Sequence, residues 1–109
     1  MAKRYRARGR VGRSTIARLR TLPSADAISA LAIYAKQDRS YRPIKDATSC
    51  RWHLCTAIGE FEILTTASKW YDTRARVGGG GAIDLAMHLL GLSFIQAVEH
   101  LQRRTGANG

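Results

Sequence analysis

The sequence is poor in cysteine, in acidic residues and in long apolar runs, and each shortage excludes a class of protein. Two cysteines among 109 residues allow at most one disulfide, which argues against a disulfide-stapled secreted domain. No apolar run reaches the ~18 residues of a membrane-spanning helix, and the arginine-rich start lacks the apolar centre of a secretory signal. The chain shows no Walker loop, paired carboxylates or Ser/His/Asp set. We therefore expect a cytoplasmic, non-catalytic protein without a membrane partner.

Acidic residues are outnumbered by 18 Lys/Arg to eight Asp/Glu, which gives the chain a net charge of +10. Residues 1–20 hold eight Lys/Arg and no acid, leaving a net charge of +2 for the other 89 residues. We expect a disordered basic arm over 1–21, a folded domain over 22–105 and a disordered tail over 106–109. The arm is either a solubilising tail or a phosphate-binding segment. We favour the second because the body has little charge with which to attract a polyanion.

The first predicted element of the domain is a helix over residues 25–37, with Ser24 as its N-cap. Four apolar residues recur at helical spacing and define its buried stripe: Ile28, Leu31, Ala32 and Ala35. Residues 37–49 are polar and contain Pro43, so they are expected to form an exposed loop.

Three short strands are predicted next, at Cys50–Thr56, Glu60–Thr65 and Ser68–Thr73, and an antiparallel meander is their simplest arrangement. Alternation along the first strand separates two sets of side chains: Cys50, Trp52 and Leu54 on one face, and Arg51, His53 and Cys55 on the other. Trp70 and Tyr71 also point to opposite faces, so one ring should fill the core while the other faces solvent.

Four glycines, residues 78–81, lead into a predicted apolar helix over 82–90, in which Asp84 and His88 form a polar pair one turn apart. Gly91 is expected to end this helix. A capping box of Ser93 and Gln96 then starts a last helix over 94–104.

This last region carries a resemblance to a known family. The matching residues run from the glycines through both helices: Gly79-Gly80-Gly81-Ala82-Ile83-Asp84-Leu85-Ala86-Met87, Gly91-Leu92-Ser93-Phe94 and Ala97-Val98. They resemble the zinc-binding domain of bacterial DNA primases, and more closely its ligand-poor form in primase-like proteins of plasmids and integrative or conjugative elements. The resemblance implies an α+β fold, with a small three-stranded antiparallel, degenerate zinc-ribbon-like sheet packed with one N-terminal helix and a C-terminal helix pair.

A zinc site is the sharpest question that the resemblance raises. The family supplies a Cys-x-x-His pair and a Cys-x-x-Cys pair, and Cys50-Arg51-Trp52-His53 matches the first in spelling. Tyr71-Asp72-Thr73-Arg74-Ala75-Arg76 stands in place of the second, and arginines beside a dication are unfavourable. We therefore expect a fold that has lost its metal and has no cofactor. The alternative is a zinc site with Cys50, His53 and Cys55 as ligands.

Binding of nucleic acid is the expected function, because the family's zinc domain contacts single-stranded template through a basic and aromatic sheet face. Aromatic rings stack on unpaired bases, and a helix start after glycines can bind a phosphate. The expected DNA contacts are Lys3, Arg4, Arg6, Arg8, Arg10 and Arg13 in the arm, with Arg51, Trp52, Lys69, Trp70, Tyr71, Arg74, Arg76, Gly79 and Gly80 in the domain. The alternative function is an interaction module that docks on a primase, helicase or relaxase through an apolar helix surface.

Overall fold

The computed structural model describes residues 12–105, so the expected DNA contacts between Lys3 and Arg10 and the tail at 106–109 lie outside the described residues. The fold is α+β, as predicted. Its elements in chain order are α2 (Arg13–Thr21), α3 (Ser24–Leu31), β1 (Tyr34–Gln37), β2 (Cys50–Thr56), β3 (Gly59–Thr66), β4 (Lys69–Asp72), β5 (Val77–Gly80), α4 (Ala82–Leu90) and α5 (Phe94–Thr105).

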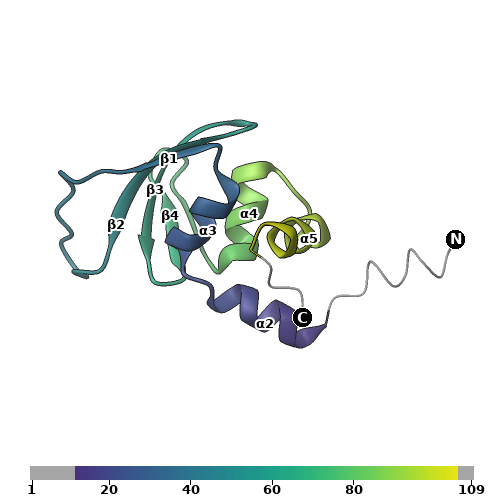
Figure 1. The fold of residues 1–109 in the computed structure, drawn as a ribbon. Coiled ribbons are helices and arrows are strands. Elements are labelled where there is room, and N and C mark those ends of the chain that lie inside the picture. The colour runs from purple at the N-terminus through teal and green to yellow at the C-terminus, as the bar shows by residue number, and fades with distance from the viewer. Residues whose placement is uncertain (1–11, 106–109) are drawn as a thin grey trace, which may run out of the picture.

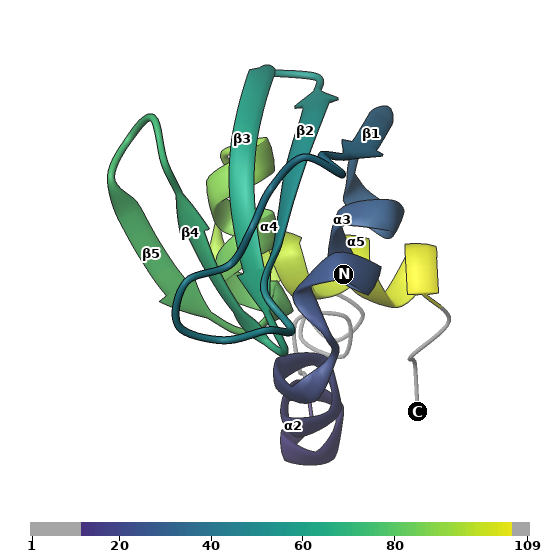
Figure 2. The same cartoon turned by 90° about the vertical axis from the view of Figure 1, so that its left-hand side faces the viewer.

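The sheet is antiparallel and has five strands in the order β1-β2-β3-β4-β5 (Figure 2). The predicted meander is confirmed as β2, β3 and β4, but the prediction of three strands was wrong because a further strand pairs with each edge. Tyr34 pairs with Cys55 at one edge, and Tyr71 pairs with Gly78 at the other. The sheet is therefore broader than the zinc-ribbon-like meander that the sequence predicted.

Strand β5 is made mostly of glycine, which is a weak strand former, and the two rings of β4 explain its composition. A Cβ atom added at Gly79 would lie 2.7 Å from Cζ2 of Trp70, and one at Gly78 would lie 3.0 Å from Cδ1 of Tyr71. Each glycine thus leaves room for the ring beside it, Trp70 on one face of the sheet and Tyr71 on the other. Gly81 has a φ of +89°, which favours glycine, and it begins α4 directly after the strand.

All the described helices lie on one face of the sheet (Figure 1). Helix α4 packs on α2, α3 and α5 and also contacts the sheet, which accounts for its nearly all-round apolar sequence. Its buried residues are Ala82, Ile83, Leu85, Ala86 and Leu89. Within residues 12–105 no single helix has the length and apolarity to cross a membrane, although the α4 and α5 pair, bent by 105°, meets both criteria when taken together.

The N-terminal region differs from the prediction in two places. The expected disordered arm over 1–21 is wrong for Arg13–Thr21, which form α2, because Leu19 is buried in the core. The predicted helix over 25–37 ends at Leu31, and the chain then turns into β1. Ser24 does not cap this helix. It lies one residue inside, and its buried Oγ has no hydrogen-bond partner in the described part of the chain.

The C-terminal predictions hold more closely. Helix α4 has the predicted bounds and ends at Gly91, which has a φ of +67°. The capping box is confirmed, since the Ser93 N–H donates to Gln96 Oε1 and the Gln96 N–H donates to Ser93 Oγ. Helix α5 then buries Ala97, Val98 and Leu101.

Candidate nucleic-acid interface

The face of the sheet opposite the helices is here called the outer face. The predicted alternation is confirmed: Leu54, Ile63 and Trp70 are buried on the helix side, whereas Tyr71 is exposed on the outer face. Figure 2 looks onto this face, and no helix covers it there. The loop over residues 38–49 crosses in front of β2 and β3 and divides the face into two parts (Figure 2).

One part of the outer face is a hollow of about 250 Å³ beside β3 and β4. Its lining combines a cation, an aromatic ring and hydroxyl groups: Ser49, Leu64, Thr66, Lys69, Trp70 and Tyr71. Lys69 and Tyr71 are two residues apart on one strand, so their side chains leave the same face. The side of the Tyr71 ring that rests on Gly78 is covered, but 41% of the residue is exposed. These are the parts that a base-stacking, phosphate-binding site requires.

The two predicted tryptophan contacts do not lie on this face. Trp70 is 5% exposed, and its ring stacks on His88 with centroids 5.0 Å apart and rests on Gly79. Trp52 is half-buried on the helix side, where its Nε1–H donates to Thr65 Oγ1 at 3.1 Å. Neither ring can stack on a base without leaving its place, which corrects the expectation for both residues.

Arg51 does lie on the outer face, but it is engaged by carboxylates. Its Nη2 and Nε donate to Asp38 Oδ2 at 2.7 and 3.0 Å, and Nε lies 3.7 Å from Glu62. The guanidinium also sits over the Tyr41 ring, 5.1 Å from its centroid. Arg51 therefore fixes the 38–49 loop to the sheet, and most of its charge is compensated.

Asp38 is the centre of this cluster. It accepts hydrogen bonds from the Ser40 hydroxyl and backbone N–H, from the His53 Nε2–H at 3.0 Å and from Arg51. The Ser40 hydroxyl, followed by His53 and Arg51, holds the pKa of Asp38 well below its ordinary value. The carboxylate is thus already satisfied by protein donors, and it keeps His53 in a fixed position.

The other side of the sheet carries a second Asp–His pair, and it is not the one predicted. Asp84 is exposed, and His88 donates instead to Asp72 Oδ2 at 2.6 Å. Asp72 also accepts the backbone N–H groups of Arg74 and Ala75, each at 2.9 Å. Burial alone would raise the pKa of Asp72, but these hydrogen bonds outweigh it and lower the pKa.

Arg74 and Arg76 are positioned by this pair. Both lie in the β4–β5 turn, which Asp72 orders through the two backbone hydrogen bonds, and both side chains are exposed. Arg76 has a φ of +60°, a conformation that a non-glycine residue adopts only when its surroundings stabilise it. Gly80 is exposed on the outer face, whereas Gly79 lies under Trp70. The two glycines form a strand and not the phosphate-binding loop considered from the sequence.

The residues considered for zinc do not converge. Cys50 and His53 lie on opposite faces of β2, and the His53 ring is held by Asp38. Cys50 Sγ accepts a hydrogen bond from Gln37 Nε2 at 3.5 Å, and Cys55 is also a free thiol. Within residues 12–105 no three His, Cys, Asp or Glu side chains are grouped closely enough to hold a metal ion.

A second Tyr–Lys pair was missed by the sequence analysis. Tyr34 and Lys36 lie on β1, in the stretch that was predicted to be helical, and they are paired in register with Cys55 and His53 of the outer face. The available signal was the spacing, because Tyr34-Ala35-Lys36 repeats in reverse the aromatic and basic alternation of Lys69-Trp70-Tyr71.

Comparison with protein-family models, with curated proteins and with solved structures finds no match to this chain. The geometry of the outer face is therefore the basis on which a function is assigned. The apolar sequence of α4 favours a docking function less than it did from the sequence, because packing within the fold buries most of this helix.

Proposed function

We propose that this chain is a non-catalytic DNA-binding protein that holds single-stranded DNA on the outer face of its sheet. The observation that carries the proposal is the hollow beside Lys69 and Tyr71, on a sheet face that the helices leave uncovered. The exposed Tyr71 ring offers a stacking surface for a base, and Lys69 offers a positive charge for the phosphate beside it.

The charge of the described residues supports this proposal. Residues 12–105 contain 13 of the 18 Lys/Arg and all eight acids. Arg51 is the one Lys or Arg of this range with a carboxylate within 4.0 Å. Three of the acids are occupied within the fold, since Asp38 and Glu62 face Arg51 and Asp72 is buried against His88. Most cations of the domain therefore remain available for an external polyanion.

Single strands suit this surface better than a duplex. A flat sheet with an exposed ring can stack on bases that are unpaired, and stacking contributes about 1–3 kcal/mol per base. A duplex hides the faces of its bases and would contact the protein mainly through phosphates. The arm outside the described residues would add sequence-independent affinity for either form. The resemblance to primase zinc-binding domains supports the same reading and suggests a gene carried by a mobile element.

Fluorescence anisotropy of a labelled oligothymidylate and of a labelled hairpin duplex, measured with the full chain over a range of salt concentrations, tests the proposal. We expect tighter binding of the single strand, with log K falling by about 0.7 per unit of log[salt] for each phosphate neutralised. Lys69→Gln should remove about one such contact. Val77→Ala is the matched control, because Val77 is equally exposed but lines none of the hollows described here. Equal affinity for the duplex, or no binding at low salt, would contradict the proposal.

A further inference from the structure

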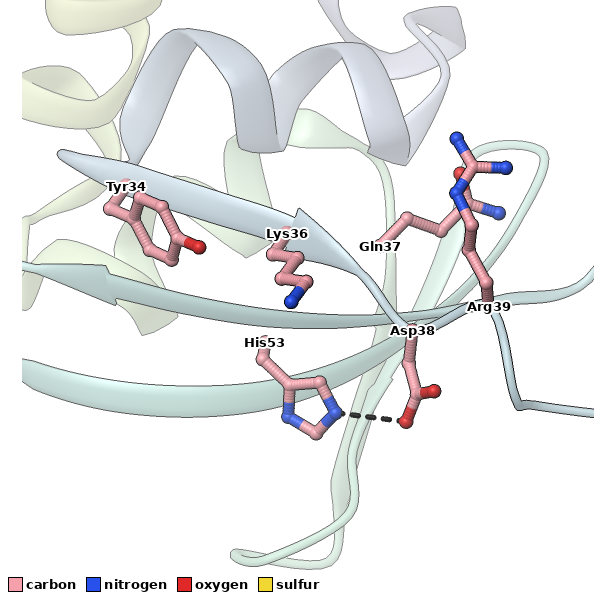
Figure 3. A pocket seen from close by; sticks show the side chains of 6 residues that line it. All are labelled: Tyr34, Lys36, Gln37, Asp38, Arg39 and His53. Carbon is pink, nitrogen blue, oxygen red and sulfur yellow. Dashed lines mark hydrogen bonds and ion pairs between the residues drawn. The ribbon is translucent and has the colours of Figure 1, made fainter.

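The largest hollow described on the molecule lies at the β1 edge of the sheet, away from Lys69 and Tyr71. Its volume is about 690 Å³, which falls within the range of about 300–1,000 Å³ that small-molecule sites occupy. Six residues of β1, the following loop and β2 line it (Figure 3): Tyr34, Lys36, Gln37, Asp38, Arg39 and His53. None of them belongs to the DNA contacts predicted from the sequence.

The side chains in this hollow are arranged like those beside β4. Figure 3 shows Tyr34, Lys36 and His53 on one side of the strands, with Gln37 and Arg39 extending on the other side of β1. Tyr34 is 59% exposed, so most of its ring can be covered by a ligand. A ring and an ammonium group two residues apart on one strand thus occur twice on the outer face, once on each side of the 38–49 loop.

The electrostatics of the hollow favour an anion. Lys36 and Arg39 have no carboxylate within 4.0 Å in the described part of the chain. Asp38, the one acid in the lining, already accepts hydrogen bonds from Ser40, Arg51 and His53 and does not compensate them. Its hydrogen bond to His53 instead holds that ring as a fixed wall of the hollow.

A second, smaller hollow of about 260 Å³ adjoins the first, because Tyr34 and His53 line both. It extends past Cys55 and Glu60 to Arg74. Its single acid, Glu60, lies between these cationic ends, and an anionic ligand would have to keep its phosphate away from that carboxylate. The Tyr34 ring therefore stands in the middle of a continuous depression that has arginine or lysine at both ends.

We infer that this depression is a second nucleotide subsite, in which one unpaired base stacks on Tyr34 while Lys36 binds the adjacent phosphate. The inference rests on the proposed function and adds the path of the strand, which would run across the sheet from Tyr71 on β4 to Tyr34 on β1. These strands are three positions apart, or about 14 Å at the usual strand spacing. A stacked strand rises about 3.4 Å per nucleotide, so the two rings hold different nucleotides of one strand.

The test measures binding of a labelled oligothymidylate by the full chain and by three variants of the β1 edge. Tyr34→Ala should weaken binding about fivefold or more, because base stacking is lost, whereas Tyr34→Phe keeps the ring and should bind within about twofold of the unchanged protein. Lys36→Gln should reduce the slope of log K against log[salt] by about 0.7. Ile33→Ala is the matched control, since Ile33 is 75% exposed beside Tyr34 but does not line either hollow. Circular dichroism checks that each variant is folded.

The outcomes separate this inference from the proposed function. If Tyr71→Ala weakens binding while Tyr34→Ala and Lys36→Gln bind like the unchanged protein, the β1 subsite is overturned and single-strand binding at β4 stands. If the unchanged protein binds no oligonucleotide, both are overturned. Thymidine monophosphate should compete only weakly, because it can fill one subsite and not both. An oligouridylate that binds more tightly than the DNA, with the same dependence on Tyr34, would support the subsite and identify its nucleotide as RNA.

Discussion

The two faces of the sheet use the same kinds of residue for opposite purposes, and Trp70 and Tyr71 show the difference most clearly. They are adjacent in β4, and each rests against a glycine of β5. Trp70 faces the helices, stacks on His88 and is almost wholly buried, whereas Tyr71 faces outward and keeps 41% of its surface exposed. Adjacent aromatics therefore do not constitute one binding surface. Strand alternation assigns one ring to stability and leaves the other for a ligand.

The two Asp–His pairs repeat this contrast. Asp72 is buried, and its hydrogen bonds join the β4–β5 turn to His88 of α4. Asp38 lies at the outer face, where it joins the 38–49 loop to Arg51 and His53 of β2. The same pairing of carboxylate and imidazole thus ties a helix to the sheet on one face and a surface loop on the other. We expect changes on the helix side to reduce stability and changes on the outer side to alter binding.

The largest effect is expected from Asp72→Ala. This change leaves His88 and the N–H groups of Arg74 and Ala75 without their acceptor, and removing one partner of a buried pair costs about 3–5 kcal/mol. Urea unfolding followed by circular dichroism measures the loss. If Asp72→Ala unfolds at the same urea concentration as the unchanged protein, the Asp72–His88 pair does not hold α4 to the sheet.

A smaller loss of stability is expected from Gly79→Ala. The added Cβ would lie 2.7 Å from the Trp70 ring, and overpacking of this kind costs about 1–3 kcal/mol. Gly80→Ala is the matched control, because a Cβ there meets no atom within 4 Å. Thermal unfolding should separate the two variants. Equal melting temperatures would mean that the Trp70 ring is not confined by Gly79.

The stability of the fold should depend on pH through Asp72. Because its pKa is lowered in the folded protein, Asp72 contributes stability above its unfolded pKa of about 3.9, and this contribution is lost as the pH falls through the folded value. Asp72→Asn should therefore be less stable than the unchanged protein at pH 7, and the difference should narrow below about pH 4. A difference that stays constant over this range would exclude a charged Asp72 as its source.

The smallest effect is expected on the outer face, from Asp38→Asn. Removing this charge releases Arg51 from its closest carboxylate and leaves Glu62 as its remaining acidic neighbour. The freed guanidinium can contact one further phosphate, so the slope of log K against log[salt] for single-stranded DNA should steepen by about 0.7. An unchanged slope would show that Arg51 does not reach the bound strand.

Several features of the fold follow from local sequence, and these were predicted well. Helix α4 has the predicted bounds because Gly81 and Gly91 flank an unbroken apolar segment, and the Ser93 capping box needs only four consecutive residues. Strand β2 likewise has the predicted bounds, and its alternation places Leu54 in the core. Each of these depends on neighbours within a few positions of the chain.

The features that were missed depend on contacts between distant residues. Strand β5 forms because β4 supplies its hydrogen-bond partners and two rings fill the space over the glycines, which no strand propensity indicates. The i,i+4 spacing of Asp84 and His88 suggested a local pair, but His88 contacts Asp72 from another element. Residues after Leu31 fit a helical spacing, yet they form β1 by pairing with β2. The Tyr34 and Lys36 hollow could not be inferred without that pairing.

The central claim is that the outer face of the sheet, and not its helix side, binds single-stranded DNA. Its most direct test compares the affinities of Tyr71→Ala and Trp70→Phe for a labelled oligothymidylate, at a temperature at which circular dichroism shows both variants to be folded. The account predicts that Tyr71→Ala weakens binding by about 5-fold to 150-fold, while Trp70→Phe binds like the unchanged protein even though it is less stable. Unchanged binding by Tyr71→Ala together with lost binding by Trp70→Phe would contradict the account.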